Sequence, residues 1–190
     1  SATFAATAFA VTYLGAHPVF IDSEPTSWNI DPSLIESAVV TLRQRGQRVA
    51  AAIPVDLYGT PANYGVVSPL LEELGVPMLE DAAEGLGASF ACQRLGSIGQ
   101  AGAISFNGNK IITSSGGGML VTNDIDMADR IRFWSTQSRE EFPWYEHREV
   151  GYNYRMSNLL AALGRSQLKR IDEEVSARRT IRDEYRRLLE

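Results

Sequence analysis

The sequence has little cysteine, little histidine and hardly any lysine. Its 190 residues contain one cysteine, Cys92, and two histidines, and only Lys110 and Lys169 of its 18 basic residues are lysines. A single cysteine excludes an intrachain disulfide and favours a reducing compartment, so we predict a cytoplasmic protein. Because lysines are so scarce, each one has to be considered individually as a functional residue.

Long apolar runs and an excess of positive charge are also missing. No stretch approaches the roughly 20 apolar residues that cross a bilayer. The net charge is −5 and there is no basic run, which argues against nucleic acid or an anionic membrane as the main partner. Apolar residues make up 44% of the chain, which is typical of a globular protein with a sizeable core. We predict no metal site.

Short apolar runs alternate with helical patterns along the chain. The opening segment, 1–15, has the small and apolar residues of a buried helix. Further helices are expected at 31–46 with Asp31 as N-cap, at 68–75 with Ser68 as N-cap, at 124–135 and at 157–189. Strands are expected at 17–22, 48–55, 76–81, 103–106 and 118–122. This alternation predicts a largely parallel, three-layer α/β fold.

Lys110 has the sequence surroundings of a chemically active lysine. It follows an expected strand and lies among Asn, Gly and Ser residues, whereas Lys169 lies among charges on an expected helix. A desolvated lysine is a nucleophilic amine that can form an imine, and the neighbouring glycines let a cofactor approach closely. A loop lysine in an ordinary turn is the alternative, and the spacing alone leaves both open.

Two more polar residues lie at the ends of expected strands. Asp81 falls at the carboxyl end of an apolar strand, where open α/β sheets bind ligands, and it could pair with a pyridinium nitrogen or simply cap the next turn. Ser105 ends another strand, where its hydroxyl could bind a phosphate or only form a turn. Together with Lys110, these residues match the needs of a pyridoxal 5′-phosphate site.

The sequence resembles the DegT/DnrJ/EryC1/StrS family of sugar aminotransferases in five segments that cover essentially the whole chain. In chain order these are TFAATAFAVTYLGAHPVFID, PVDLYGTPA, LEDAAEGLGA, SFNGNKIITSSGGGMLVTND and GYNYRMSNLLAALGRSQL. The fourth is most similar to the transaminases that make UDP-linked 4-amino-6-deoxy sugars of the bacillosamine type. The resemblance implies the three-layer major domain of a fold-type I, aspartate aminotransferase-like enzyme, present here as a fragment.

The resemblance also assigns roles at the cofactor. It makes Lys110 the residue that carries pyridoxal 5′-phosphate as an imine and Asp81 the carboxylate on the pyridine nitrogen. Ser105 matches a phosphate ligand and Phe4 the aromatic residue that stacks on the cofactor ring. Glu84 lies near the phenolic oxygen, at a position where many members have Gln.

Three further positions follow from the same resemblance. Asn153 matches a residue that reaches the cofactor phosphate of the neighbouring subunit, which implies a homodimer with shared active sites. His147 is a candidate for contacting the substrate, or simply an exposed loop histidine. Asp56 stands where a His is common and could be only a strand-end polar residue.

The implied domain organisation divides the chain near residue 156. We expect residues 1–156 to be the central part of the cofactor-binding large domain, without the glycine- and serine-rich turn that precedes it in the family. Residues 157–190 are expected to form a long helix leading toward a C-terminal small domain that the sequence lacks. The implied activity moves an amino group from an amino acid, usually glutamate, to a keto group of a nucleotide-linked deoxysugar for glycan biosynthesis. The alternatives are a sugar 3-dehydratase of the same fold and a non-catalytic α/β ligand-binding module.

Overall fold

The computed structural model describes residues 2–189, which fall into two compact units that meet in sequence between Ile104 and Ser105. The helices of the first unit are α1 (Ala6–Tyr13), α2 (Ile35–Gln44) and α3 (Tyr64–Glu73), with short 3₁₀ turns at Pro32–Leu34 and Leu57–Gly59. Its strands are β1 (Leu79–Asp81), β2 (Ser89–Phe90), β3 (Gln93–Arg94) and β4 (Ala101–Ser105), whose last residue opens the second unit. The second unit contains β5 (Gly118–Val121), α4 (Ile125–Ser135), α5 (Asn158–Leu168) and α6 (Ile171–Leu189). Between residues 2 and 189, no helix is both long and apolar enough to span a membrane.

Parallel pairing around β1 confirms the predicted sheet type. β1 pairs in parallel with β4, with Asp81 opposite Ala103. Along its other edge, Ala52 bridges Met78 and Val55 bridges Asp81, again in parallel. The expected strand 48–55 is reduced to these bridges because Pro54 has no N–H to donate to the ladder, although its carbonyl still accepts from the Asp81 N–H at 2.9 Å.

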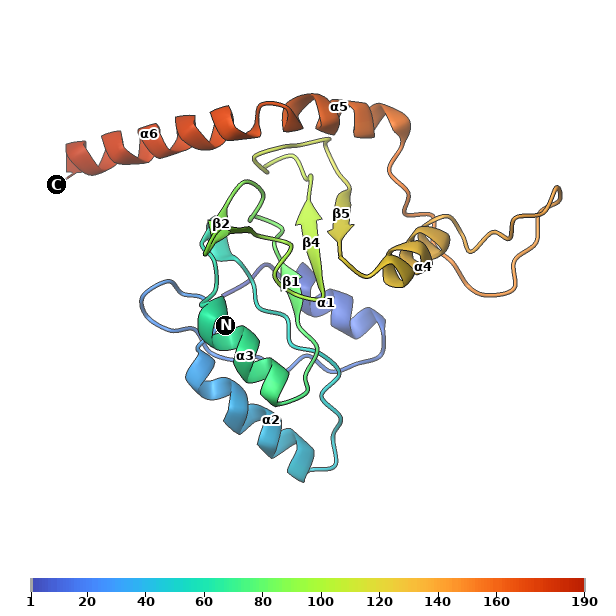
Figure 1. Cartoon of the computed structure of the whole chain (residues 1–190), viewed down its shortest axis with the longest axis horizontal. Coiled ribbons are helices and arrows are strands. Elements are labelled where there is room, and N and C mark those ends of the chain that lie inside the picture. The colour runs from blue at the N-terminus through green and yellow to red at the C-terminus, as the bar shows by residue number, and fades with distance from the viewer. Residues whose placement is uncertain (1, 190) are drawn as a thin grey trace. The chain divides into compact units, whose positions relative to one another are not determined.

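The core of the first unit lies under α2 and α3, which Figure 1 shows as neighbouring helices. Arg43 in the last turn of α2 donates to the Leu74 carbonyl at the end of α3, at 2.7 Å. The buried residues repeat at three- and four-residue spacing, as expected for helices with one apolar face. They are Ile35 and Val39 in α2 and Tyr64, Val67 and Leu71 in α3.

The predicted start of α3 is wrong. The helix begins at Tyr64 rather than after Ser68, and it continues through Pro69. Ser68 is not a cap; its hydroxyl contacts the Met78 sulfur at 3.9 Å. Burial of one apolar face over the whole helix outweighs the single backbone hydrogen bond that proline removes. The N-cap predicted at Asp31 is confirmed for the 3₁₀ turn Pro32–Leu34 that leads into α2, since Asp31 Oδ1 accepts from the Ser33 N–H at 2.9 Å. α2 itself begins after Leu34 without a side-chain cap.

Three other expectations differ from the structure. The expected strand 17–22 is not a strand, because an extended segment needs a ladder partner and it has none among the described residues; the bridge beside it joins Ser23 to Ile30. α1 is shorter than predicted, and none of its residues is buried. The expected helix 157–189 is interrupted at Lys169 and Arg170, which gives α5 and α6.

Candidate active site

Asp81 is the last residue of β1, at the carboxyl end of the strand, and both of its carboxylate oxygens accept hydrogen bonds. Thr7 Oγ1, in α1, donates to Oδ2 at 2.6 Å, and the Ala83 N–H donates to Oδ1 at 3.1 Å. The bond to Ala83 is the turn cap that the sequence offered as the alternative role, and it occupies only one oxygen. The two bonds together fix the orientation of a half-buried carboxylate.

The turn that carries Phe4 is tied to the same carboxylate. The Phe4 carbonyl accepts from the Thr7 N–H at 3.2 Å, while the single hydroxyl proton of Thr7 goes to Asp81. Thr7 therefore connects the backbone of Phe4 to the side chain of Asp81. The Phe4 ring itself is 83% exposed, so its faces are open to a planar ligand.

Glu84 is held by the tight turn at residues 57–59. Its Oε2 accepts from the Tyr58 N–H at 2.8 Å. The turn packs closely on the Glu84 backbone: a Cβ at Gly59, which has φ +76°, would lie 2.9 Å from the Glu84 carbonyl oxygen, so only glycine fits there. The main chain thus engages the Glu84 carboxylate, and the contact of Glu84 with a cofactor oxygen stays a prediction.

Two buried carboxyl groups lie beside Asp81. Asp56 is 0% exposed, and its Oδ1 accepts from the Tyr64 hydroxyl at 2.8 Å and from the Ala62 N–H at 3.2 Å. Glu80 is 1% exposed. Its Oε1 accepts from the Gly96 N–H at 2.5 Å, and its Oε2 accepts from Ile98 at 2.9 Å and from Gly99 at 3.4 Å.

Burial raises the pKa of Asp56 and of its hydrogen-bond partner Tyr64. Desolvation raises the pKa of Asp56 from 3.8 to about 7, the Tyr64 hydroxyl opposes that rise, and the nearby Glu80 charge adds to it. Burial, with the charges of Asp56 and Glu80, also raises the pKa of Tyr64. Asp56 is therefore more than a strand-end polar residue. Sequence reasoning missed Glu80 and Tyr64, although a Glu inside the apolar run VPMLED was a signal.

Ser105 and Lys110 lie in the second unit, on one turn. Ser105 Oγ accepts from the Asn107 N–H at 3.3 Å, which is the turn-forming role that the sequence offered as the alternative. The Lys110 N–H donates to the Asn107 carbonyl at 3.0 Å. The loop closes where the Ser114 N–H donates to the Phe106 carbonyl at 3.0 Å. The two residues are thus fixed relative to one another by backbone hydrogen bonds, and the Lys110 side chain is half-buried.

His147 and Asn153 lie on an irregular arm after α4 that folds back on itself. Thr136 bridges Asn153 and Arg139 bridges His147, both antiparallel. His147 Nδ1 lies 2.9 Å from the Gln137 carbonyl oxygen. Because a carbonyl only accepts, Nδ1 is the donor in this contact. Both predicted residues are exposed on this arm.

The tip of the arm is held by its own aromatic residues. The rings of Phe142 and Trp144 stack with centroids 5.1 Å apart, and the Arg139 guanidinium lies 4.1 Å from the centroid of the Tyr145 ring. Through these contacts, Trp144 and Tyr145 anchor the loop.

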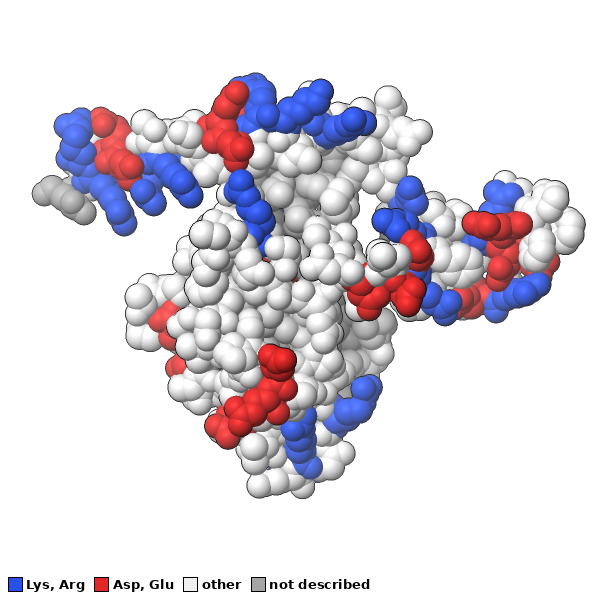
Figure 2. Space-filling view, viewed as in Figure 1, with Lys and Arg blue, Asp and Glu red and all other residues white. Residues whose placement is uncertain are grey.

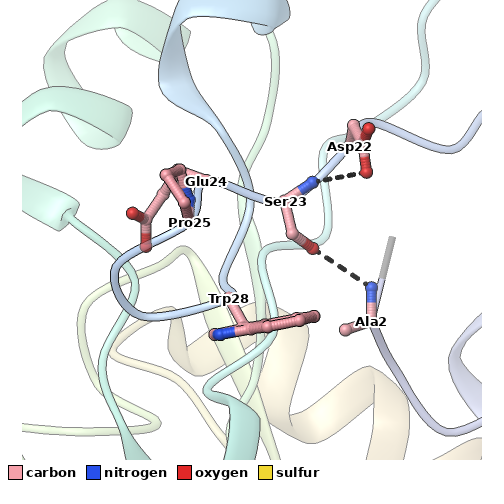
Figure 3. Close-up of a pocket in the computed structure, with 6 residues that line it drawn as sticks. All are labelled: Ala2, Asp22, Ser23, Glu24, Pro25 and Trp28. Carbon is pink, nitrogen blue, oxygen red and sulfur yellow. Dashed lines mark hydrogen bonds between the residues drawn. The ribbon is translucent and has the colours of Figure 1, made fainter.

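A pocket in the first unit lies apart from the predicted site residues (Figure 3). Trp28, with the left-handed φ of +64°, forms part of its wall. Glu24 holds the turn: its Oε2 accepts from the Thr26 N–H at 2.6 Å and its Oε1 accepts from the Ser27 N–H at 2.6 Å and from the Ser27 hydroxyl. The remaining lining residues are Ala2, Asp22, Ser23 and Pro25.

The predicted site residues divide between the units. Phe4, Asp81 and Glu84 belong to the first unit, where Thr7 joins the Phe4 turn to Asp81. The others belong to the second, where Ser105 and Lys110 share a turn and His147 and Asn153 share the arm. Thr7, which sequence reasoning missed, gave no local signal, since it is one of several small residues in TFAATAFA.

A parallel α/β sheet with a fixed carboxylate at a strand end and a lysine on a strand-end turn is the arrangement of a fold-type I aminotransferase domain. The model of the DegT/DnrJ/EryC1/StrS aminotransferase family matches residues 1–190, and the chain belongs to this family. The crystal structure of a DegT DnrJ EryC1 StrS aminotransferase from Brucella abortus superposes with a TM-score of 0.92 at 34% identity, over 98% of this chain and 50% of that one.

Curated relatives fall in the same family. The chain is 47% identical over 189 residues to EpsN of Bacillus subtilis (strain 168), a protein named as a pyridoxal phosphate-dependent aminotransferase. This alignment covers 100% of this chain and 49% of EpsN. It is 38% identical over 181 residues to the GDP-perosamine synthase of Caulobacter vibrioides, covering 95% of this chain and 47% of that enzyme. The chain thus spans about half the length of the curated relatives it matches.

Proposed function

We propose that the full-length protein is a pyridoxal 5′-phosphate-dependent aminotransferase acting on a nucleotide-linked keto deoxysugar. The observation that carries this proposal is the Asp81 carboxylate, fixed at a strand end by Thr7 and Ala83. Relatives support the substrate class, since they include a GDP-perosamine synthase and a UDP-2-acetamido-2-deoxy-3-oxo-D-glucuronate aminotransferase of Pseudomonas aeruginosa that is 35% identical over 184 residues. We further propose glutamate as amino donor and a 4-amino-6-deoxy sugar of the bacillosamine type as product.

The residues present fit the cofactor. Asp81 offers a fixed carboxylate for a protonated ring nitrogen, and Phe4 offers an exposed aromatic face for the ring. Ser105 would contact the phosphate and Glu84 would lie near the phenolic oxygen. When bound, pyridoxal 5′-phosphate supplies the electron sink for breaking a bond at the donor's α-carbon.

Lys110 would perform the covalent and proton-transfer steps. Its amine would hold the cofactor and would take the proton from the donor's α-carbon. Asp81 keeps the ring nitrogen protonated throughout, because an ionised carboxylate beside that nitrogen favours its charged form.

The assembly and domain organisation belong to the same proposal. A homodimer would let Asn153 reach the cofactor phosphate of the neighbouring subunit and place His147 near the sugar nucleotide. Residues 1–156 would be the central part of the large domain, and residues 157–190 would lead toward a smaller C-terminal domain. The single cysteine supports action in the cytoplasm.

Borohydride reduction of the full-length protein with pyridoxal 5′-phosphate, followed by peptide mass mapping, tests the proposal. We expect a phosphopyridoxyl group on the Lys110 peptide and none on the peptide of Lys169, the matched control within the chain. A folded protein with unmodified Lys110 would overturn the proposal in favour of the ligand-binding module. Mass analysis of the sugar product then distinguishes transamination, which adds nitrogen from the donor, from 3-dehydration, which does not.

A further inference from the structure

One oxygen of the buried Asp56 carboxyl group has no hydrogen-bond partner in the part of the chain that the structure describes. Among the buried side-chain atoms of the described residues, Asp56 Oδ2 is left without a hydrogen-bond partner, while Oδ1 of the same group has two donors. A fully buried carboxylate oxygen without a donor is costly, so a protonated Oδ2 explains the arrangement better than an ionised one.

Glu80 is the acceptor for that proton. Both of its oxygens already accept from backbone N–H groups at Gly96, Ile98 and Gly99, so the proton is better placed on Asp56 than on Glu80. Asp56 and Glu80 lie on paired segments, since Val55 bridges Asp81 in parallel and the Asp81 N–H donates to the Pro54 carbonyl, and the Glu80 charge raises the pKa of Asp56. Two adjacent buried carboxyl groups do not both ionise readily, so one proton is shared between them.

We propose that Asp56 carries this proton on Oδ2 and donates it to Glu80, and that the pair is a positioning element for Asp81. The positioning role rests on the function proposed above, and the proton sharing does not. Tyr64, Glu80 and Asp81 are the titratable groups that act on this cluster, and all three are acidic or neutral. The shared proton therefore limits the negative charge beside Asp81.

The connection to Asp81 runs through the backbone. Glu80 precedes Asp81 on β1, and the Asp56 N–H donates to the Asp81 carbonyl at 3.0 Å. The loop that supplies the donors to Glu80 lies directly on β4, since a Cβ at Gly102 would come within 2.1 Å of the Gly96 carbonyl oxygen. Repulsion between two ionised carboxylates would therefore push apart segments that have no space to adjust, and Asp81 would move with them.

The pair predicts a pH dependence with a definite sign. Burial raises the pKa of Asp56 from 3.8 to about 7, so between these values the folded protein keeps a proton that the unfolded chain releases. The contribution of Asp56 to stability is fully present below pH 4 and is lost as the pH rises through about 7. Over that window, its contribution to the unfolding equilibrium constant rises by up to about tenfold per pH unit.

Asp56→Asn and Glu80→Gln test where the proton lies. An Asn at 56 still accepts at Oδ1 and donates from its amide nitrogen in place of the protonated Oδ2, so we expect a folded protein. The ratio of the wild-type unfolding constant to that of Asp56→Asn should rise with pH between 4 and 7, by up to about tenfold per pH unit. Glu80→Gln should be destabilised at every pH, because its amide group would face backbone N–H groups. A constant ratio, or a Glu80→Gln protein as stable as Asp56→Asn, would overturn the proton assignment.

The positioning role needs a readout that a purely structural pair would not change. We would measure the Kd for pyridoxal 5′-phosphate of the full-length wild type and of Asp56→Asn at pH 6 and pH 8.5. Circular dichroism would first establish that both proteins are folded at both pH values. The ratio of wild-type to variant Kd should be close to one at pH 6 and rise at least about threefold by pH 8.5, when the second carboxyl ionises. The titration of the cofactor itself cancels in this ratio.

The outcomes separate the two proposals. A ratio of Kd values that stays constant with pH would overturn the positioning role and leave the proposed function intact. Wild type that binds no pyridoxal 5′-phosphate would overturn the proposed function, and the positioning role with it, whereas the unfolding experiment would still decide the proton assignment.

Discussion

The two units of the chain hold their candidate site residues by different means. Among the described residues, every buried apolar side chain except Ile112 lies in the first unit. There, Asp81 is the end of a paired strand and its side chain is bonded to a helix far away in sequence. In the second unit, Ser105 and Lys110 are held by hydrogen bonds within a few residues of one another. A core therefore fixes the Asp81 carboxylate, and a local turn fixes the backbone of Lys110.

The helices of the second unit also lack the buried faces that α2 and α3 have in the first unit. α4, α5 and α6 contain no buried residues. Along α6, Arg and acidic side chains alternate on the surface (Figure 2), with ion pairs such as Arg178–Glu174 at 2.9 Å and Arg187–Glu184 at 2.6 Å. Exposed pairs of this kind contribute little to stability, because solvent and salt screen them. The segment EEVSARRTIRDEYRR is therefore a solvated helix face, since all of its residues are exposed or half-buried.

The largest effect is expected from the locally held lysine. Lys110→Ala should lower the rate of amino transfer at least about 1,000-fold, because both the covalent step and the proton transfer need its amine. The melting temperature should change little, since the lysine lies on a turn. Lys169→Ala is the control and should keep full activity; equal losses in the two variants would contradict the assignment.

Asp81→Asn tests the residue that the core holds. The amide fits the same space but carries no charge for the ring nitrogen, so we expect a loss of about 100-fold in kcat. Unfolding by urea should show a folded protein close to wild type in stability. A collapse in stability together with activity would mean that Asp81 serves the fold rather than the reaction.

Thr7→Val should have a smaller effect on the same carboxylate. It removes the 2.6 Å hydrogen bond to Asp81 Oδ2 and keeps the shape of the side chain. A bond to a charged group contributes about 1.5–3 kcal/mol, so a loss of about tenfold in kcat/KM is expected. Thr7→Ser retains the hydroxyl and should restore most of the activity, which separates loss of the bond from loss of packing.

His147→Ala tests the exposed arm. If His147 contacts the substrate, the KM for the sugar nucleotide should rise about three- to tenfold while the affinity for pyridoxal 5′-phosphate stays unchanged. His17→Ala, at the other exposed histidine, is the control. An unchanged KM in both variants would support the simpler interpretation of His147 as a surface residue.

The smallest effect is expected at the turn in Figure 3. Hydrogen bonds from the Ser27 hydroxyl and from the Thr26 and Ser27 N–H groups lower the pKa of Glu24 from 4.5 to about 2. Its contribution to stability is present above pH 4.5 and is lost as the pH falls through about 2. Glu24→Gln should therefore lower the melting temperature by only about 2 °C at pH 6 and not at all near pH 2. A difference that grows toward low pH would contradict the assignment.

Local patterns predicted much of the secondary structure. The Asp31 cap was predicted correctly, and the expected helix 124–135 corresponds to α4. The expected strand 76–81 contains β1. The failures have a common physical cause. Segment 17–22 needs a partner strand, and α3 starts where its buried face starts, so neither is decided by the residues of the segment alone.

The sequence by itself determined the family, the parallel α/β class and the choice of Lys110, Asp81 and Ser105 as candidates, because these depend on residue type and local spacing. Only the tertiary structure decided that Thr7 orients Asp81, 74 residues along the chain, and that Asp56 lies against Glu80. Such contacts arise when strands pair and a core excludes water. The spacing of apolar residues indicates which face of a helix or strand is buried, but not which side chain from a distant part of the sequence will contact that face.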